Sequence, residues 1–235
     1  MGVKVETLST KLASINKRIC AAKQQKPPRF AEAQRPPFSK EIITLIAASK
    51  KQSVGKIREA FNAGQHKFAE NYLQEALEKQ HLLSDLAIEW HFIGTIQSNK
   101  TKLIAAHFDW VQSVNRLSIA RRLSDQRPAN LNALNICIEV NIDESPTKSG
   151  VLPKAIFELA TEIKKLNHLN LRGLMVIPEK NNIDAFQKTA RLYAQLISAG
   201  FALDTLSMGM SDDFESAIAA GSNMVRIGTA IFGKR

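Results

Sequence analysis

The sequence predicts an α/β fold, a single eight-stranded parallel (β/α)8 barrel of the TIM type, over residues 41–235. Eight short apolar runs alternate with helix-like segments from Ile42 to the C-terminus. The length of 235 residues suits one such domain. An open doubly wound sheet is the alternative, but it usually has a glycine-rich turn after its first strand, and residues 49–53 contain no glycine.

An amphipathic helix is predicted before the barrel, in the segment 1–22. Apolar residues recur at spacings of three and four, which is typical of a helix with one buried face: Val5, Leu8, Leu12, Ile15 and Ile19. Only Gly228 to Arg235 follow the last predicted strand, too few for a full closing helix. We therefore expect the N-terminal helix to pack on the barrel in that place.

Residues 23–40 predict an exposed loop, and the densest basic patch of the chain begins just before it. The segment contains Pro27, Pro28, Pro36 and Pro37, which cannot continue a helix. The net charge of +10 raises the question of a nucleic-acid partner. Basic and acidic residues alternate along most of the chain, however, so we expect a solvated basic surface and no specific nucleic acid.

The elements of the barrel follow in order. The first strand is followed by a helix over 53–63 that Gly64 ends, and later helical spacing covers 156–166 and 186–197. The eight predicted strands span residues 42–48, 67–70, 89–93, 110–114, 136–140, 170–176, 203–206 and 224–227.

Composition limits where the protein works. No apolar run approaches the length of a membrane span, and the N-terminus has no apolar signal core. Cys20 and Cys137 lie far apart, so we expect two buried thiols and no disulfide framework. These features predict a cytoplasmic protein with no membrane partner.

Two predicted strand ends resemble a phosphate-binding site, and a third carries an amine. Ser207 to Ser211 and Gly228-Thr229 follow the last two strands with small and hydroxyl-bearing residues that expose backbone N–H groups. Lys50 follows the first strand. A lysine for an aldehyde and a seat for a phosphate together suggest pyridoxal phosphate.

Each of these residues also has a structural interpretation. Lys50 is equally typical of a solvated strand end, as Lys51 is, and Ser211 could be the N-cap of the helix that contains Phe214. Arg226, inside an apolar strand, needs a partner, which could be a salt bridge or the ring of a bound cofactor. His91 fits a hydrogen-bonded packing residue better than a base, and no histidine or cysteine spacing indicates a metal site.

Several long motifs occur in order along the chain, in residues 45–50, 68–75, 88–100, 172–175, 207–213 and 225–233. Taken together, they resemble the YggS-like pyridoxal phosphate homeostasis proteins, from about Ile42 to the C-terminus. The resemblance implies the barrel of the alanine racemase N-terminal domain, pyridoxal 5'-phosphate as cofactor and a cytoplasmic carrier or regulator without established turnover.

The resemblance also implies residue roles. Lys50 would form the Schiff base and Asn71 would lie beside the ring, while Arg226 would face the pyridine nitrogen. The phosphate would be held by Ser207, Ser211, Gly228 and Thr229. Lys148 would lie near the mouth of the site as a weaker candidate for cofactor transfer. Ala69 replaces the glycine that is usual in the family, which could alter the backbone beneath the ring.

A carrier is favoured over an enzyme. An arginine at the pyridine nitrogen disfavours its protonation and weakens the ring as an electron sink. Racemisation would need a second acid–base group on the opposite face of the substrate α-carbon. In alanine racemase this group is a tyrosine from an additional domain, which this chain lacks. The alternatives are a low-activity racemase or lyase and a barrel that binds phosphate without pyridoxal. We expect a monomer, with PLP-dependent apoenzymes as possible partners.

Overall fold

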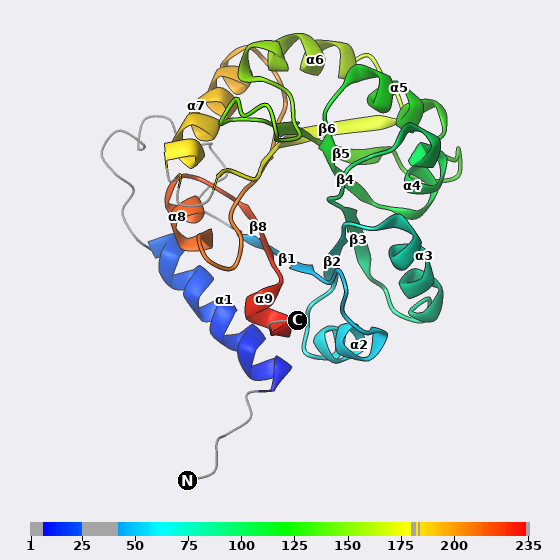
Figure 1. Ribbon diagram of the computed structural model, residues 1–235, viewed down its shortest axis with the longest axis vertical. Helices are drawn as coiled ribbons and strands as arrows, with labels where there is room; N and C mark the ends of the chain where they lie inside the picture. The colour runs from blue at the N-terminus through cyan, green and yellow to red at the C-terminus, as the bar shows by residue number, and fades with distance from the viewer. Residues whose placement is uncertain (1–6, 25–41, 180–181, 183, 234–235) are drawn as a thin grey trace.

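The computed structural model describes residues 7–24, 42–179, 182 and 184–233. Its eight described strands form a closed barrel in sequence order, with every neighbouring pair parallel and β8 paired with β1 (Figure 1). The barrel is confirmed over the open sheet. The strands are β1 (Thr44–Ala48), β2 (Lys67–Glu70), β3 (Glu89–Phe92), β4 (Trp110–Val114), β5 (Leu134–Val140), β6 (Leu169–Val176), β7 (Thr205–Ser207) and β8 (Met224–Ile227).

All eight predicted strands are present, and the largest shift in position is at β7. This strand starts two residues later than predicted and includes Ser207. Asp204, just before it, has its backbone N–H bonded to the carbonyl of Arg172, and Asn223 accepts the N–H of Leu206 through its side chain. These contacts with β6 and β8 set the start of the strand, and an apolar run alone does not reveal them.

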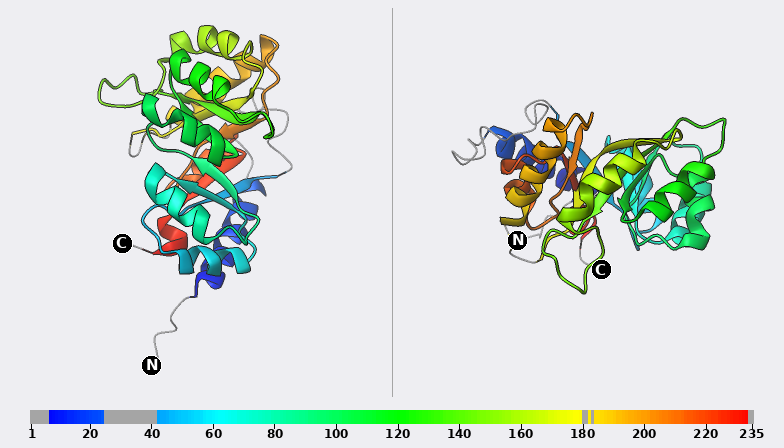
Figure 2. Two further views of the ribbon diagram at one scale, coloured as in Figure 1. Left: turned by 90° about the vertical axis from the view of Figure 1, so that its right-hand side faces the viewer. Right: turned by 90° about the horizontal axis from the view of Figure 1, so that it is seen from above.

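The helices lie outside the ring of strands (Figures 1 and 2). Ser53 caps α2, as its hydroxyl accepts the N–H of Lys56 at 3.4 Å, and the left-handed Gly64 lies just beyond the helix end. The described helices after β1 are α2 (Val54–Asn62), α3 (Leu73–Leu82), α4 (Thr101–His107), α5 (Leu117–Asp125), α6 (Ile156–Ile163), α7 (Asp184–Ser198), α8 (Phe214–Ala219) and α9 (Thr229–Phe232), with short 3-10 turns η2 (Ser98–Lys100) and η3 (Pro153–Ala155).

The N-terminal helix takes the place of a full helix after β8, as the sequence predicts. It is α1 (Leu8–Gln24), and it packs against α8, α9 and α2. Leu12, Ile15 and Ile19 are buried on its inner face. Arg18 pairs with Glu215 and lies over a ring of α8. Val5 and most of the predicted loop 23–40 lie outside the described residues, and positions 23 and 24 continue the helix.

The core has two layers. A large cluster fills the space between strands and helices, and a smaller one fills the barrel itself with Ile46, Ala69, Ile93, Trp110, Cys137, Met175 and Met224. Ala69 is fully buried and pairs in regular register with Ala48 and His91. Its methyl group therefore contributes to the interior, and β2 keeps regular pairing at the position where the resemblance implies a glycine.

The two cysteines differ. Cys137 is buried in β5, and burial raises the pKa of its thiol to about 12. Cys20 is exposed, so the expectation of two buried thiols is wrong for this residue. It lies on α1 just outside the face formed by Ile15 and Ile19, and the apolar character of cysteine does not override that position.

None of the described helices is long and apolar enough to cross a bilayer. Within the same residues, no group of three or more His, Cys, Asp or Glu side chains comes together in the way that a metal ion would need.

Candidate functional site

The parallel strands bring the predicted site residues to one end of the barrel. Lys50 follows β1, Asn71 follows β2, the loop 207–211 begins at the end of β7, and Gly228 follows β8. All carboxyl ends of a closed parallel barrel lie at the same face, where barrel enzymes have their sites. Topology therefore places these four segments around one opening.

Lys50 lies at the second position of a tight turn. The backbone N–H of Gln52 donates to the carbonyl of Ser49 at 3.0 Å and closes the turn. The N–H of Ser49 in turn donates to the carbonyl of Ala69 at 2.9 Å, which ties the end of β1 to β2. The amine-bearing residue is therefore held on the rim of the barrel.

Asn71 has an unused hydrogen-bonding atom. Its side-chain oxygen is buried and has no hydrogen-bond partner in the described structure. The residue also lines a cavity of about 480 Å³ together with Tyr72, Gly94 and Lys100, and the other predicted site residues are not among those that line it. A buried polar atom without a partner costs free energy unless a ligand or water satisfies it. This atom fits a site that binds a polar group.

The loop after β7 reaches the segment after β8. Ser211 accepts the backbone N–H of Ala230 at 3.3 Å. Gly209 has φ of +98°, and a side chain there would lie within 2.7 Å of the Cβ of Ala217, so this loop conformation requires glycine. The cap position of α8 is Asp213, so the N-cap interpretation of Ser211 is wrong.

Gly228 brings β8 against β1. A Cβ atom at this position would be only 3.0 Å from the carbonyl oxygen of Ala48, which is two residues before Lys50. The end of β1, which leads into Lys50, and the predicted phosphate segment 228–229 are therefore close neighbours. Of the contacts seen here, this one joins the two halves of the predicted site most directly.

Arg226 is buried inside the barrel and bonded to neutral groups. It is 3% exposed, and its two guanidinium Nη atoms donate to Ser207 Oγ at 2.6 Å and to the carbonyl of Val176 at 2.9 Å. Burial lowers its pKa to about 10, so it stays charged at neutral pH. The simple salt bridge considered from the sequence is not among its hydrogen bonds, and a buried cation of this kind suits a polar ligand.

The hydroxyl of Ser207 both donates and accepts a hydrogen bond within the protein. Its hydroxyl donates to Gln112 Oε1 at 2.7 Å and accepts from Arg226. A hydroxyl has a single proton to donate, and a phosphate oxygen is an acceptor. Ser207 can therefore contribute to the site by holding Arg226 in place, whereas its hydroxyl would have to leave Gln112 to donate to a phosphate.

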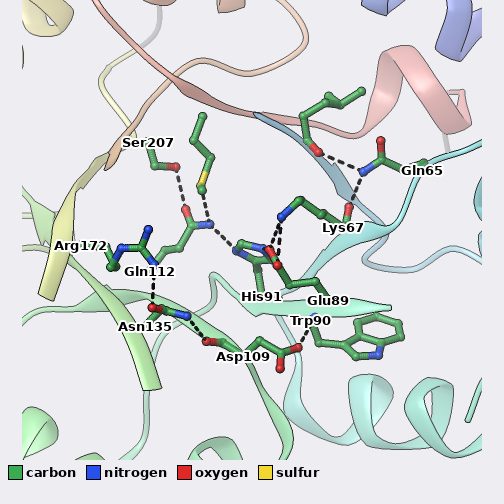
Figure 3. Close-up of polar contacts among 12 residues, drawn as sticks. Gln65, Lys67, Glu89, Trp90, His91, Asp109, Gln112, Asn135, Arg172 and Ser207 are labelled. Atoms are coloured by element: carbon green, nitrogen blue, oxygen red, sulfur yellow. Dashed lines mark hydrogen bonds and ion pairs between the residues drawn. The ribbon is translucent and has the colours of Figure 1, made fainter. Parts of the chain in front are cut away.

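A chain of hydrogen bonds, buried except at its Glu89 end, continues from Ser207 to the other end of the barrel (Figure 3). The Nε2 atom of Gln112 lies 2.9 Å from Nδ1 of His91, and Nε2 of His91 lies 2.8 Å from Glu89. Because the Gln112 amide donates, Nδ1 of His91 accepts and its Nε2 donates to the carboxylate. Along the chain from Arg226 to Glu89, the donor and acceptor of each hydrogen bond therefore determine the donor and acceptor of the next.

The charges along this chain agree with those directions. Burial lowers the pKa of His91, so the ring is neutral. Burial would raise the pKa of Glu89, but hydrogen bonds from His91 and Lys67 lower it to about 2. His91 also stacks on Trp110, with 5.3 Å between ring centroids, which confirms the packing interpretation of this histidine.

Lys148 is already engaged. Its ammonium pairs with Asp143 at 2.7 Å and donates to the carbonyl of Ile177 at 3.2 Å. Burial would raise the pKa of Asp143, but hydrogen bonds from Lys148, Asn182 and the N–H of Glu179 together lower it. Lys148 therefore joins the loops after β5 and β6 at the same face, and this ion pair must open before its amine can react.

Two sets of residues near the site were not predicted from the sequence. Gln112 carried a signal, because an amide in the apolar run 110–114 must find partners inside the barrel. The second set, on α3 and at the end of β2, carries charged side chains that contact the turn of Lys50: Glu70, Glu75 and Lys79. Their positions in helical or strand sequence do not reveal that contact.

Comparison with known proteins agrees with this architecture. The family model described as "Alanine racemase, N-terminal domain" matches residues 41–235. The chain is 49% identical to the pyridoxal phosphate homeostasis protein of Pseudomonas aeruginosa PAO1 over 233 residues, which cover 98% of this chain and 97% of the relative.

Solved structures extend the comparison. PipY of Synechococcus elongatus PCC7942, solved with PLP bound, is similar with a TM-score of 0.80 and 33% identity, over 97% of this chain and all of PipY. Alanine racemase from Corynebacterium glutamicum is similar with a TM-score of 0.66 and 15% identity, over 93% of this chain and 61% of the racemase. The racemase likeness shows the fold alone.

Proposed function

Because the chain belongs to the pyridoxal phosphate homeostasis proteins, with the fold of the alanine racemase N-terminal domain, we propose that it binds pyridoxal 5'-phosphate on Lys50 and serves as a carrier or regulator of that cofactor. The PLP-bound structure of the similar PipY supports the choice of cofactor. The observation that carries the proposal is the close approach of Gly228 to the carbonyl of Ala48, which supports a site shared by the turn of Lys50 and the segment that would hold the phosphate.

The residues present fit this cofactor. Lys50 supplies the amine, and Ser211 with the N–H groups of Gly228 and Thr229 would hold the phosphate. Asn71, whose buried side-chain oxygen has no partner among the described residues, would lie beside the ring. Bound pyridoxal phosphate supplies an aldehyde and an electron-accepting ring; the protein orients both and limits the exposure of the aldehyde.

Arg226 favours the carrier over the enzyme. We place its guanidinium at the pyridine nitrogen and Ser207 behind it, as the partner that fixes it. A guanidinium that is charged at neutral pH disfavours protonation of that nitrogen, so the ring stays a weak electron sink. Amino-acid chemistry on the ring would therefore be slow.

One of the two tyrosines is excluded as an acid–base group by its burial. Tyr193 is fully buried on α7, so it cannot face a substrate. Tyr72 is 51% exposed and lines the cavity beside Asn71, so it remains the tyrosine to test as an acid–base group. Lys148 would transfer cofactor to PLP-dependent apoenzymes only after its pair with Asp143 opens.

Titration of the protein with pyridoxal 5'-phosphate tests the proposal. We expect a visible absorption band that saturates with one cofactor per chain in the wild type and in Lys51→Ala, and that is lost in Lys50→Ala. The cofactor-loaded protein should show no sustained turnover of amino acids. Sustained racemisation or lyase activity that disappears in Lys50→Ala and falls in Tyr72→Phe would reject the pure carrier.

A further inference from the structure

The turn that carries Lys50 contains a residue in an unfavourable conformation. Lys51 occupies the third position of the turn between Ser49 and Gln52, with φ of +60°. This left-handed conformation at the third position is typical of glycine, because a side chain there is strained. Such strain persists only where neighbouring groups hold the backbone in place.

Helix α3 provides those groups on both sides of Lys50. On the N-terminal side, the buried ammonium of Lys79 donates to the carbonyl of Ser49 at 2.7 Å. On the C-terminal side, the carboxylate of Glu75 accepts the backbone N–H of Lys51. Lys50 therefore lies between two peptide groups that are both held by one helix.

The holding groups also hold each other. Lys79 pairs with Glu75 at 2.6 Å and with Glu70 at 2.7 Å, and Glu70 accepts the hydroxyl of Ser49 at 2.6 Å. The side chains of Lys79 and Glu70 are 6% and 0% exposed. Burial raises the pKa of Glu70, against the opposing effect of hydrogen bonds from Lys79 and Ser49.

Stability alone does not account for this cluster. Burying charges costs desolvation energy, so a buried ion pair adds little compared with apolar packing of the same volume. Three hydrogen bonds join the cluster to the turn at Ser49 and Lys51, the two neighbours of Lys50. The cluster therefore acts on the place where the amine is attached.

We propose that Lys79, Glu75 and Glu70 form a clamp that positions Lys50 for covalent capture of the cofactor aldehyde. The proposal rests on the proposed function, which assigns the capture to Lys50. In that step the Lys50 nitrogen forms a double bond with the aldehyde carbon, and the aldehyde oxygen leaves as water with the two amine protons. The clamp takes no part in these bonds; it holds the backbone on both sides of Lys50, and so fixes the point and direction from which the side chain reaches the aldehyde.

Two ligands separate positioning from general binding. Pyridoxal 5'-phosphate is captured covalently, and the captured fraction is fixed with borohydride at successive times. Pyridoxine 5'-phosphate has an alcohol in place of the aldehyde, so it reports the non-covalent site alone. The variants are Lys79→Met and Glu75→Leu, of which Glu75 is the partly exposed residue. The control is Lys165→Met, because Lys165 pairs with Glu162 at the surface, just beyond the end of α6.

We expect Lys79→Met and Glu75→Leu to slow capture at Lys50 by about 10- to 100-fold, while the affinity for pyridoxine 5'-phosphate stays close to that of the wild type. Glu75→Gln keeps an oxygen for the N–H of Lys51 and should recover most of the rate. Lys165→Met should match the wild type. If Lys79→Met does not fold, Glu75→Leu carries the test.

Capture at the wild-type rate in both clamp variants would overturn the clamp. An equal loss of affinity for both ligands would also overturn it, because the residues would then support the fold in general. A wild-type protein that captures no cofactor at Lys50 would instead reject the proposed function, and the clamp with it.

Discussion

Replacing Gln112 with leucine tests the hydrogen-bonded chain inside the barrel. Its amide joins His91 to Ser207, and all three side chains are buried. Leucine fills a similar volume but leaves two buried polar groups, the Nδ1 of His91 and the hydroxyl of Ser207, without this partner. At about 1–3 kcal/mol for each unsatisfied group, the free energy of unfolding should fall by about 2–6 kcal/mol.

The matched control is Gln80→Leu. Gln80 also donates through its amide, to the carbonyl of His107 at 3.0 Å, but this bond is exposed to water. Its loss should cost about 1 kcal/mol or less, because water replaces the partner. Urea unfolding of the cofactor-free proteins gives both values. A loss in Gln112→Leu no larger than that in Gln80→Leu would refute the chain as a determinant of stability.

Three further predictions follow from the same structure. Because the pKa values of Glu89 and His91 are lowered in the folded protein, acid favours the unfolded state. The free energy of unfolding should fall first as the pH drops below 6.5, the ordinary histidine pKa, and further between pH 4.5 and about 2. In His91→Gln, urea midpoints measured against pH should no longer show the first of these two falls. Gly209→Ala should cost about 2–4 kcal/mol and weaken cofactor binding, because the new side chain has a left-handed backbone and also clashes with Ala217. Gly64→Ala, with a similar φ but open space around it, should cost only about 1–2 kcal/mol. Ile15→Ala should lower the free energy of unfolding by about 2–5 kcal/mol if α1 closes the helical layer, and an unchanged urea midpoint would contradict that packing.

The sequence predicted the barrel because its signals are local. Alternating runs mark each strand, and the amphipathic spacing of the N-terminal segment predicted a helix that packs on the barrel. Residues at strand ends, such as Lys50 and Gly228, were also accessible to prediction, since parallel topology brings all strand ends to one face.

The parts that escaped prediction depend on contacts between distant segments. Gln112 and Ser207 are 95 residues apart, and Lys79 reaches Ser49 across 30 residues. A sequence shows that a polar residue lies in an apolar strand, but the tilt and register of the closed barrel decide which partner it meets. Ser211 is a residue whose type suggested a role that the fold does not give it. A serine fits an N-cap, but the N-cap position of α8 is Asp213, two residues further along the chain.

Borohydride reduction of the cofactor-loaded protein, followed by mass spectrometry of its peptides, tests the central claim most directly. The account predicts one pyridoxyl group per chain, attached to Lys50. A label on Lys51 or Lys148, a label scattered over exposed lysines, or no label at saturating cofactor would contradict the assignment of the end of β1 as the cofactor anchor.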